Sequence, residues 1–227
     1  MKILVVDNNV MNESWGARDL VRSLTVDPSI TVVVRRAPAL DLPADPRGFD
    51  KIVFSGSLTA ANDRAPWIEK HDQFLKQSIA LKKPTLCICY GHQALGRVLG
   101  GWENVAKTKT PEYGWTQIDQ KPNNRLFKGL PDRFYSFSSH FDEVLHVPKG
   151  TRLTATSPDC GIQGIEMEDA PVFGIQFHPE KSLDEGNQAI ARRKKSGVPK
   201  VLLNADRGSE LFSEQVAQVI FSNFLKE

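Results

Sequence analysis

The sequence predicts an α/β protein of the flavodoxin-like kind, with a doubly wound, mostly parallel sheet flanked by helices and a smaller antiparallel extension in its second half. Two observations predict this class. Up to Gly100, short apolar runs alternate with segments of helical periodicity, as in the βα units of a parallel sheet. After Gly101, short strand-like runs separated by turns follow without long helices. In such sheets ligands bind at the carboxyl ends of the strands, so we expect the site there.

Length and composition exclude several classes of protein. The chain of 227 residues suits one domain over residues 1–227, and 40% hydrophobic residues can bury a substantial core. A net charge of +2 is too near zero to predict nucleic acid or an anionic membrane as the main partner. No apolar run approaches the length of a membrane span. The three cysteines are an odd number without CxxC spacing, which indicates a reduced, cytoplasmic protein.

The first half should supply the parallel strands and their covering helices. The predicted strands are apolar runs at Lys2–Asp7, Ile30–Val34, Lys51–Phe54 and Thr85–Ile88. Helices are predicted from Asn12 to Leu24, from Pro66 to just before Pro84, and over the apolar positions Ala94, Leu95, Val98 and Leu99.

The second half should add shorter strands and close on a helix. The predicted strands are Glu112–Ile118, Phe134–Ser138, Arg152–Thr156, Ile162–Met167 and Val172–Phe177. Residues 183–207 have the least regular pattern and carry four consecutive basic residues from Arg192, so we expect an irregular basic insertion there. Apolar residues at helical spacing from Glu210 to Leu225 predict the final helix.

Cys89 occupies the most informative position in the chain. The apolar strand that ends at Ile88 passes into a helical pattern with no residues to spare for a loop. A residue at such a strand-to-helix corner is presented on a strained backbone, as in a nucleophile elbow, and a helix N-terminus favours a thiolate. Gly91 would let the helix pass close to the strand. The alternative is a small buried hydrophobe, which does not explain the polar residues from Tyr90 to Gln93 that follow.

A cysteine nucleophile needs a base, and His178 is the candidate among five histidines. An apolar strand delivers His178 at its end, and Glu180 follows two positions later, where an extended chain points in the same direction. The carboxylate could therefore hold the imidazole in one tautomer and stabilise its charged form, while Pro179 stiffens the pair. The alternative is a histidine at a strand end beside an incidental acid.

The other histidines have weaker claims. We expect His92 to pack against the strand and His71 to be solvated, and His140 to line the site or make a structural hydrogen bond. No group of residues has the spacing of metal ligands.

Together, the segments Cys89–Gln93 and Phe177–Glu180 resemble the motifs of the class I (triad) glutamine amidotransferase family. The resemblance covers nearly the whole chain, and the pair of motifs is highly specific. Within the family, Pro111–Trp115 and Ser139–Val144 are most similar to amidotransferase domains of the GMP-synthase type, whereas Phe177–Ser182 is similar to the imidazole-glycerol-phosphate branch.

The resemblance implies roles for individual residues. It makes Cys89 the nucleophile, His178 the general base and acid, and Glu180 its orienting partner. The backbone N–H groups of Tyr90 and Ser57 would form the oxyanion hole, in a chain that has Gly56-Ser57-Leu58 where a Gly-Gly-Pro-like run is usual. The remaining residues implied to contact the substrate are Gln93, Ser139, His140 and Phe141.

The implied activity is hydrolysis of the side-chain amide of L-glutamine through a γ-glutamyl thioester, with release of ammonia to an acceptor. No cofactor is implied, and ammonia would go to a separate synthetase subunit or the protein would act alone. Two alternatives stay open: a hydrolase of larger γ-glutamyl compounds, and a catalytically silent regulatory module. The basic run from Arg192 would be a solvated surface, or would touch a partner or cover the site.

Overall fold

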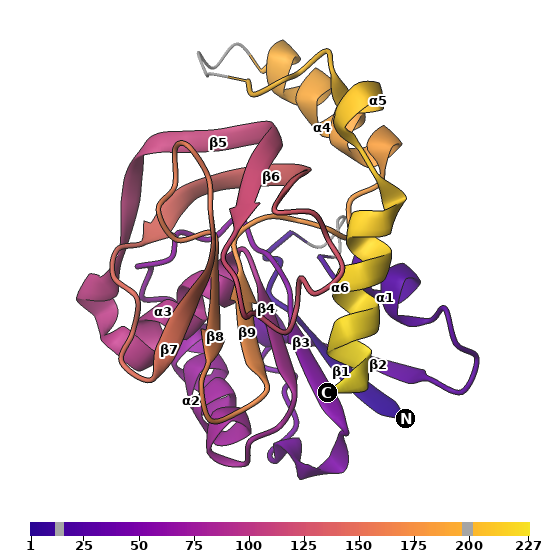
Figure 1. The fold of residues 1–227 in the computed structure, drawn as a ribbon. Coiled ribbons are helices and arrows are strands. Elements are labelled where there is room, and N and C mark those ends of the chain that lie inside the picture. Colours follow the sequence, from indigo (N-terminus) through magenta and orange to yellow (C-terminus); the bar gives the residue numbers. More distant parts are fainter. Residues whose placement is uncertain (12–15, 197–201) are drawn as a thin grey trace.

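The fold is built on one nine-stranded sheet, seen in a computed structural model that describes residues 1–11, 16–196 and 202–227 (Figure 1). The strands follow the order β2-β1-β3-β4-β9-β8-β7-β5-β6 across the sheet. Their bounds are β1 Lys2–Asp7, β2 Thr31–Arg36, β3 Lys51–Phe54, β4 Thr85–Ile88, β5 Val105–Gln120, β6 Arg133–Val144, β7 Thr151–Thr156, β8 Gly164–Met167 and β9 Val172–Ile175.

Pairing divides the sheet into a parallel and an antiparallel part. Strands β2, β1, β3, β4 and β9 run parallel. Beyond β9, the strands β8, β7, β5 and β6 each pair antiparallel with their neighbour, and β5 and β6 form a long hairpin. The predicted fold class, a mostly parallel sheet with an antiparallel extension, is confirmed.

Helices cover both faces of the parallel part. The α-helices are α1 Arg18–Leu24, α2 Pro66–Ala80, α3 Tyr90–Gly100, α4 Leu183–Lys195, α5 Gly208–Leu211 and α6 Glu214–Lys226, and short 3₁₀ helices span Ala37–Ala39, Pro46–Gly48 and Trp102–Asn104. Alternate residues of β1 enter two different cores: Ile3 and Val5 pack with α1 and α6, whereas Leu4 and Val6 pack with α2 and α3. Burial on both faces explains why these strands are continuous apolar runs.

Some element boundaries differ from the sequence prediction. Helix α1 begins at Arg18 and not at Asn12, and residues 12–15 lie outside the described part of the chain. The final helix is interrupted after Leu211, because Phe212 and Ser213 have extended backbone, so α5 and α6 replace one helix from Glu210.

The segment 183–207, expected to be irregular, begins with a regular helix. Ser182 and Glu185 form a reciprocal capping box, with the Ser182 hydroxyl accepting from the Glu185 N–H and the Glu185 carboxylate accepting from the Ser182 N–H. Ile190 of this helix is buried against Trp115 of β5 and Phe137 of β6. The expectation missed α4 because nine of its thirteen residues are polar, charged or glycine, and one side of the helix supplies its packing on the sheet. Residues 197–201 of the segment lie outside the described part.

Within the described residues, every helix is too short or too polar to cross a membrane.

Candidate active site

Cys89 lies at the corner between β4 and α3. Its backbone has φ 51° and ψ −104°, a left-handed conformation that is strained for a residue with a side chain. The Cys89 N–H donates to Ile175 O of β9 at 2.8 Å, which fixes the corner to the neighbouring strand. A Cβ atom at Gly91 would lie 2.7 Å from the Phe54 carbonyl oxygen, so only glycine lets α3 pass this close to β3.

His178 and Glu180 are brought to this corner by the chain that follows β9. The His178 N–H donates to Phe137 O of β6 at 2.7 Å, and Nδ1 of His178 lies 2.6 Å from Oε1 of Glu180. Because a carboxylate only accepts, Nδ1 carries the proton in this contact and Nε2 is left for a second partner. Arg22 donates to the Glu180 carbonyl oxygen at 2.9 Å and holds the turn from outside.

The position of Gly56 shows how closely the imidazole approaches Cys89. A Cβ atom built on Gly56 would lie 2.8 Å from Cε1 and 3.7 Å from Nε2 of His178, and 3.4 Å from Cβ of Cys89. Gly56, which follows the end of β3, therefore lies close to both the His178 and the Cys89 side chains. The structure brings Cys89, His178 and Glu180 together, as the two sequence motifs predict.

The charges of Glu180 and His178 reinforce one another. Burial disfavours the imidazolium, but interactions with the Glu180 carboxylate and the Cys89 sulfur outweigh burial and raise the pKa of His178 to about 10. Burial alone would raise the pKa of Glu180, yet the facing imidazolium lowers it. Glu180 is thus a carboxylate and His178 an imidazolium at neutral pH, which places a positive charge beside the Cys89 sulfur.

A pocket of about 210 Å³ opens above Cys89. It is lined at its reactive end by Gly56, Ser57, Cys89 and His178, and also by Asn9, Gly16, Leu58, Tyr113, Phe137, Ser139, Glu180, Lys181, Ala189 and Arg192. The described residues contain no group of three or more histidine, cysteine or acidic side chains that could hold a metal ion.

The two residues predicted to form the oxyanion hole lie near Cys89, because Tyr90 follows it in the chain and Ser57 follows Gly56, whose Cβ position is 3.4 Å from Cβ of Cys89. Tyr90 is the first residue of α3, and the first N–H groups of a helix have no partner within it. Its side chain points away and packs on Trp67 and His71, with ring centroids 5.7 and 5.8 Å apart, so its backbone alone can serve the site. Ser57 lines the pocket directly.

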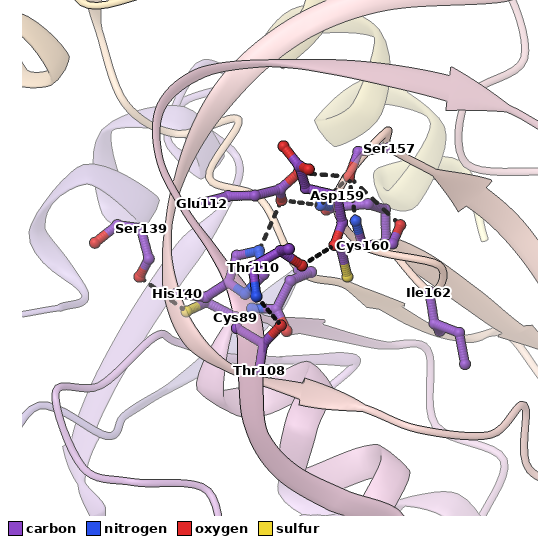
Figure 2. Close-up of polar contacts among 12 residues, drawn as sticks. Cys89, Thr108, Thr110, Glu112, Ser139, His140, Ser157, Asp159, Cys160 and Ile162 are labelled. Carbon is purple, nitrogen blue, oxygen red and sulfur yellow. Dashed lines mark hydrogen bonds and ion pairs between the residues drawn. The ribbon is translucent and has the colours of Figure 1, made fainter. Parts of the chain in front are cut away.

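Ser139 is the only one of the four predicted substrate contacts that lines this pocket; its carbonyl oxygen lies 4.0 Å from the Cys89 sulfur (Figure 2). The Gln93 amide is buried elsewhere and donates to Asp142 O at 2.9 Å and Gln176 Oε1 at 3.1 Å. The Phe141 ring lies under the Arg193 guanidinium, 5.1 Å from its centroid.

His140 faces the opposite side of β6, where Glu112 forms the centre of a buried network (Figure 2). Nε2 of His140 lies 2.7 Å from Glu112 Oε2, and the Ser157 hydroxyl donates to Oε1 at 2.5 Å. Gln163 donates to the same carboxylate. His140 therefore makes the structural hydrogen bond that was one of its two predicted roles, and it holds β6 in place next to Ser139.

Sequence reasoning gave no role in the site to Glu112 or Tyr113, and it treated Arg192 only as part of a basic run that would be solvated, touch a partner or cover the site. Glu112 and Tyr113 lie within a predicted strand, but their partners are distant in the sequence. The signal for Arg192 was the capping-box pattern of Ser182 and Glu185, which predicts a helix start and was not used.

Gly56→Ala is expected to lower kcat/KM for glutamine about 10- to 100-fold, because the new methyl group would displace the imidazole from Cys89, and small displacements of reacting groups have effects of that size. Ammonia release measures the loss of activity, and urea unfolding measures whether the substitution also changes stability. Gly48→Ala is the matched control, since a Cβ atom there meets nothing within 4 Å. Unchanged activity in Gly56→Ala would show that the imidazole has room to move.

A strained cysteine facing a histidine–glutamate pair at the carboxyl end of a parallel sheet is the arrangement that thiol-dependent hydrolysis of an amide requires. Comparison with known families agrees with this chemistry: the family model of the class I glutamine amidotransferases matches residues 4–196. The chain belongs to the class I glutamine amidotransferase family, and is a glutamine-hydrolysing enzyme that releases ammonia.

Individual relatives support the assignment. The chain is 32% identical to a subunit of the glutamine-hydrolysing GMP synthase of Pyrococcus abyssi over 195 residues, 84% of this chain and 95% of that protein. It is 33% identical to the glutamine-hydrolysing GMP synthase of Aeropyrum pernix over 159 residues, 69% of this chain but only 30% of that longer protein. A solved glutamine amidotransferase of Thermotoga maritima shares the fold, with a TM-score of 0.77, 22% identity and coverage of 100% of this chain and 96% of that one.

Proposed function

We propose that Cys89, His178 and Glu180 form the catalytic triad that hydrolyses the side-chain amide of L-glutamine, and that a separate synthetase subunit receives the ammonia. The observation that carries the proposal is the convergence of Cys89 and His178 on Gly56, with Glu180 bonded to the far nitrogen of the same imidazole. A thiol with no base, or a base with no orienting group, would leave this chemistry incomplete.

The reaction follows from these positions. The Cys89 thiolate attacks the carboxamide carbon, and the N–H groups of Tyr90 and Ser57 stabilise the oxyanion, each with a typical contribution of about 3 kcal/mol. The imidazolium of His178 gives its proton to the leaving nitrogen, the C–N bond breaks and ammonia departs. Neutral His178 then takes a proton from water, whose oxygen attacks the γ-glutamyl thioester. Collapse of this second intermediate releases glutamate and restores the thiolate and the imidazolium.

The size of the pocket supports glutamine over larger γ-glutamyl compounds. Its volume of about 210 Å³ is below the roughly 300–1,000 Å³ of sites that hold drug-sized ligands. An amino acid suits this volume, whereas a γ-glutamyl compound with a large leaving group would have to extend into solvent.

The names and lengths of the relatives support a separate protein as the acceptor. The Pyrococcus abyssi and Thermococcus kodakarensis relatives are named as subunits of GMP synthase, and the aligned region covers 95% of each. In the longer Aeropyrum pernix protein the matched part is 30% of the chain. We therefore infer that the acceptor is a synthetase subunit of the GMP-synthase kind.

Glutamate release, the product common to all three substrates, should be measured with L-glutamine, γ-glutamyl methylamide and γ-glutamyl anilide, each alone, with and without such a synthetase subunit. The proposal expects L-glutamine to have the highest kcat/KM. Higher kcat/KM for the substituted amides would favour the γ-glutamyl hydrolase alternative. Absence of turnover with every substrate, whether or not the synthetase is added, would favour the silent regulatory module.

A further inference from the structure

Helix α4 forms one wall of the pocket above Cys89, through Ala189 and Arg192. Three contacts hold this helix in a fixed position. Ile190 is buried against Trp115 and Phe137, and the Tyr113 hydroxyl donates to the Ala189 carbonyl oxygen at 3.3 Å. A Cβ atom at Gly186 would lie 2.6 Å from the Trp115 ring, so the helix is packed closely on β5. Arg192, about one turn after Ala189, therefore lines the pocket from a helix that is held in a fixed position.

The cations around the pocket differ in whether they already have a partner. Lys181 pairs with Asp19, and His178 pairs with Glu180. Arg192 also lines the pocket, but its guanidinium makes no hydrogen bond or ion pair with the residues of 1–11, 16–196 or 202–227. Its neighbours on α4 are engaged elsewhere: Arg193 stacks on Tyr113 and Phe141, with centroid distances of 5.3 and 5.1 Å, and Lys194 pairs with Asp206 at 2.9 Å.

Glutamine carries a negative charge that could pair with the Arg192 guanidinium. Glutamine carries an α-carboxylate at the end of its side chain opposite the reacting carboxamide. With the carboxamide at Cys89, the α-groups point away from the imidazole and toward the outer part of the pocket. Glu180 is the one carboxylate lining the pocket among the described residues, and it is bonded to His178, so no acid there competes for a guanidinium. An arginine can hold a carboxylate through two parallel N–H bonds, which fixes orientation as well as charge.

We propose that Arg192 binds the α-carboxylate of glutamine and is a specificity-determining residue of this site. The inference rests on the proposed function, because it takes the pocket above Cys89 to be the glutamine site. It gives α4 and its basic run a role beyond a solvated surface: the helix carries the residue that selects substrates with a free α-carboxylate.

The test measures binding and turnover separately. The variants are Arg192→Gln, which removes the charge, Arg192→Lys, which keeps it without the fork, and Lys195→Gln, which removes an exposed charge from the same helix away from the pocket. Steady-state ammonia release is measured with L-glutamine and with its α-amide, which lacks the carboxylate. Cys89 is also labelled with 6-diazo-5-oxo-norleucine, a diazoketone with the α-groups of glutamine that forms a thioether with loss of N₂, and with the small neutral reagent iodoacetamide.

Arg192→Gln is expected to lower kcat/KM for glutamine about tenfold, mainly through KM, as loss of one charge-assisted contact at an exposed site predicts. The same variant should be labelled about tenfold more slowly by the diazoketone at subsaturating concentration, and at the wild-type rate by iodoacetamide. Turnover of the α-amide should change less than twofold. Arg192→Lys should recover part of the loss, and Lys195→Gln should match the wild type.

The proposal is overturned if Arg192→Gln lowers kcat/KM for the α-amide as much as for glutamine. It is equally overturned if labelling by iodoacetamide slows as much as labelling by the diazoketone. Either result would mean that Arg192 affects the reactivity of Cys89 and not the binding of the α-carboxylate. The proposal is also overturned if Arg192→Gln slows glutamate release from γ-glutamylglycine, whose second carboxylate lies on the leaving group, but does not slow ammonia release from glutamine. Failure of the diazoketone to label wild-type Cys89 faster than iodoacetamide would instead overturn the assignment of the glutamine site, and the inference with it.

Discussion

Replacing Cys89 with alanine is expected to reduce ammonia release from glutamine by at least about 10⁴-fold, because the variant cannot form the γ-glutamyl thioester. The corner that holds Cys89 should survive. Alanine meets the same backbone strain at φ 51° as cysteine does, and the Cys89 N–H bond to Ile175 O does not involve the side chain. We expect the free energy of unfolding in urea to change by no more than about 1–2 kcal/mol, the range of small truncations.

Cys87→Ala is the matched control for this prediction. Cys87 is a buried cysteine on β4, two residues before the corner, and it packs in the core with α2 and α3. Loss of its sulfur should reduce stability by about 1 kcal/mol and leave ammonia release within about twofold of the wild type. Residual activity above about 1% in Cys89→Ala, or an equal loss in Cys87→Ala, would contradict the assignment of Cys89 as nucleophile.

Local patterns in the sequence were sufficient to predict the parallel part of the fold and the proximity of Cys89, His178 and Glu180. The run before Cys89 is apolar because β4 is buried on both faces, and Gly91 is required because α3 passes the Phe54 carbonyl. The spacing of His178 and Glu180 predicts that their side chains share one side of an extended segment. In the structure, Nδ1 of His178 lies 2.6 Å from Oε1 of Glu180. These features depend on residues close together in the chain.

The features that the sequence did not predict depend on contacts between distant segments. Helix α4 is mostly polar, and it is stabilised by packing on Trp115 and Phe137 more than by its own pattern. Glu112 could not be paired with His140 and Gln163 before the antiparallel strands were arranged side by side. The pocket likewise required α4 to be placed above Cys89. Nonlocal pairings of this kind are not encoded in periodicity or motif spacing.

Glu180→Gln is expected to lower kcat for glutamine about 10³- to 10⁴-fold while Cys89 and His178 stay in place, the effect found when the orienting acid of a triad becomes an amide. The carboxylate accepts the Nδ1–H of His178 at 2.6 Å, whereas a glutamine amide can also donate there and hold the wrong tautomer. Glu168→Gln, an exposed substitution of the same kind, is the control and should leave kcat unchanged. A loss below about tenfold in Glu180→Gln would reduce Glu180 to a structural role.

The pH profile of kcat/KM in Glu180→Gln distinguishes the two effects of Glu180, which orients the His178 ring and raises the pKa of His178. Against the effect of burial, Glu180 and Cys89 raise the pKa of His178 to about 10, so removing the Glu180 charge lets burial lower that pKa. The alkaline limb of the kcat/KM profile should then move down by at least about one pH unit.

The free energy of unfolding should follow the same linkage. For a raised histidine pKa, stabilisation by the pair is complete below the unfolded pKa of about 6.5 and is lost as pH rises toward 10. For the lowered pKa of Glu180, stabilisation is present above the ordinary value of 4.5 and is lost as pH falls below it. The difference in urea unfolding between the wild type and Glu180→Gln should therefore be largest between about pH 4.5 and 6.5. A difference that is constant from pH 4 to 10 would show that the pair does not carry opposite charges in the folded protein.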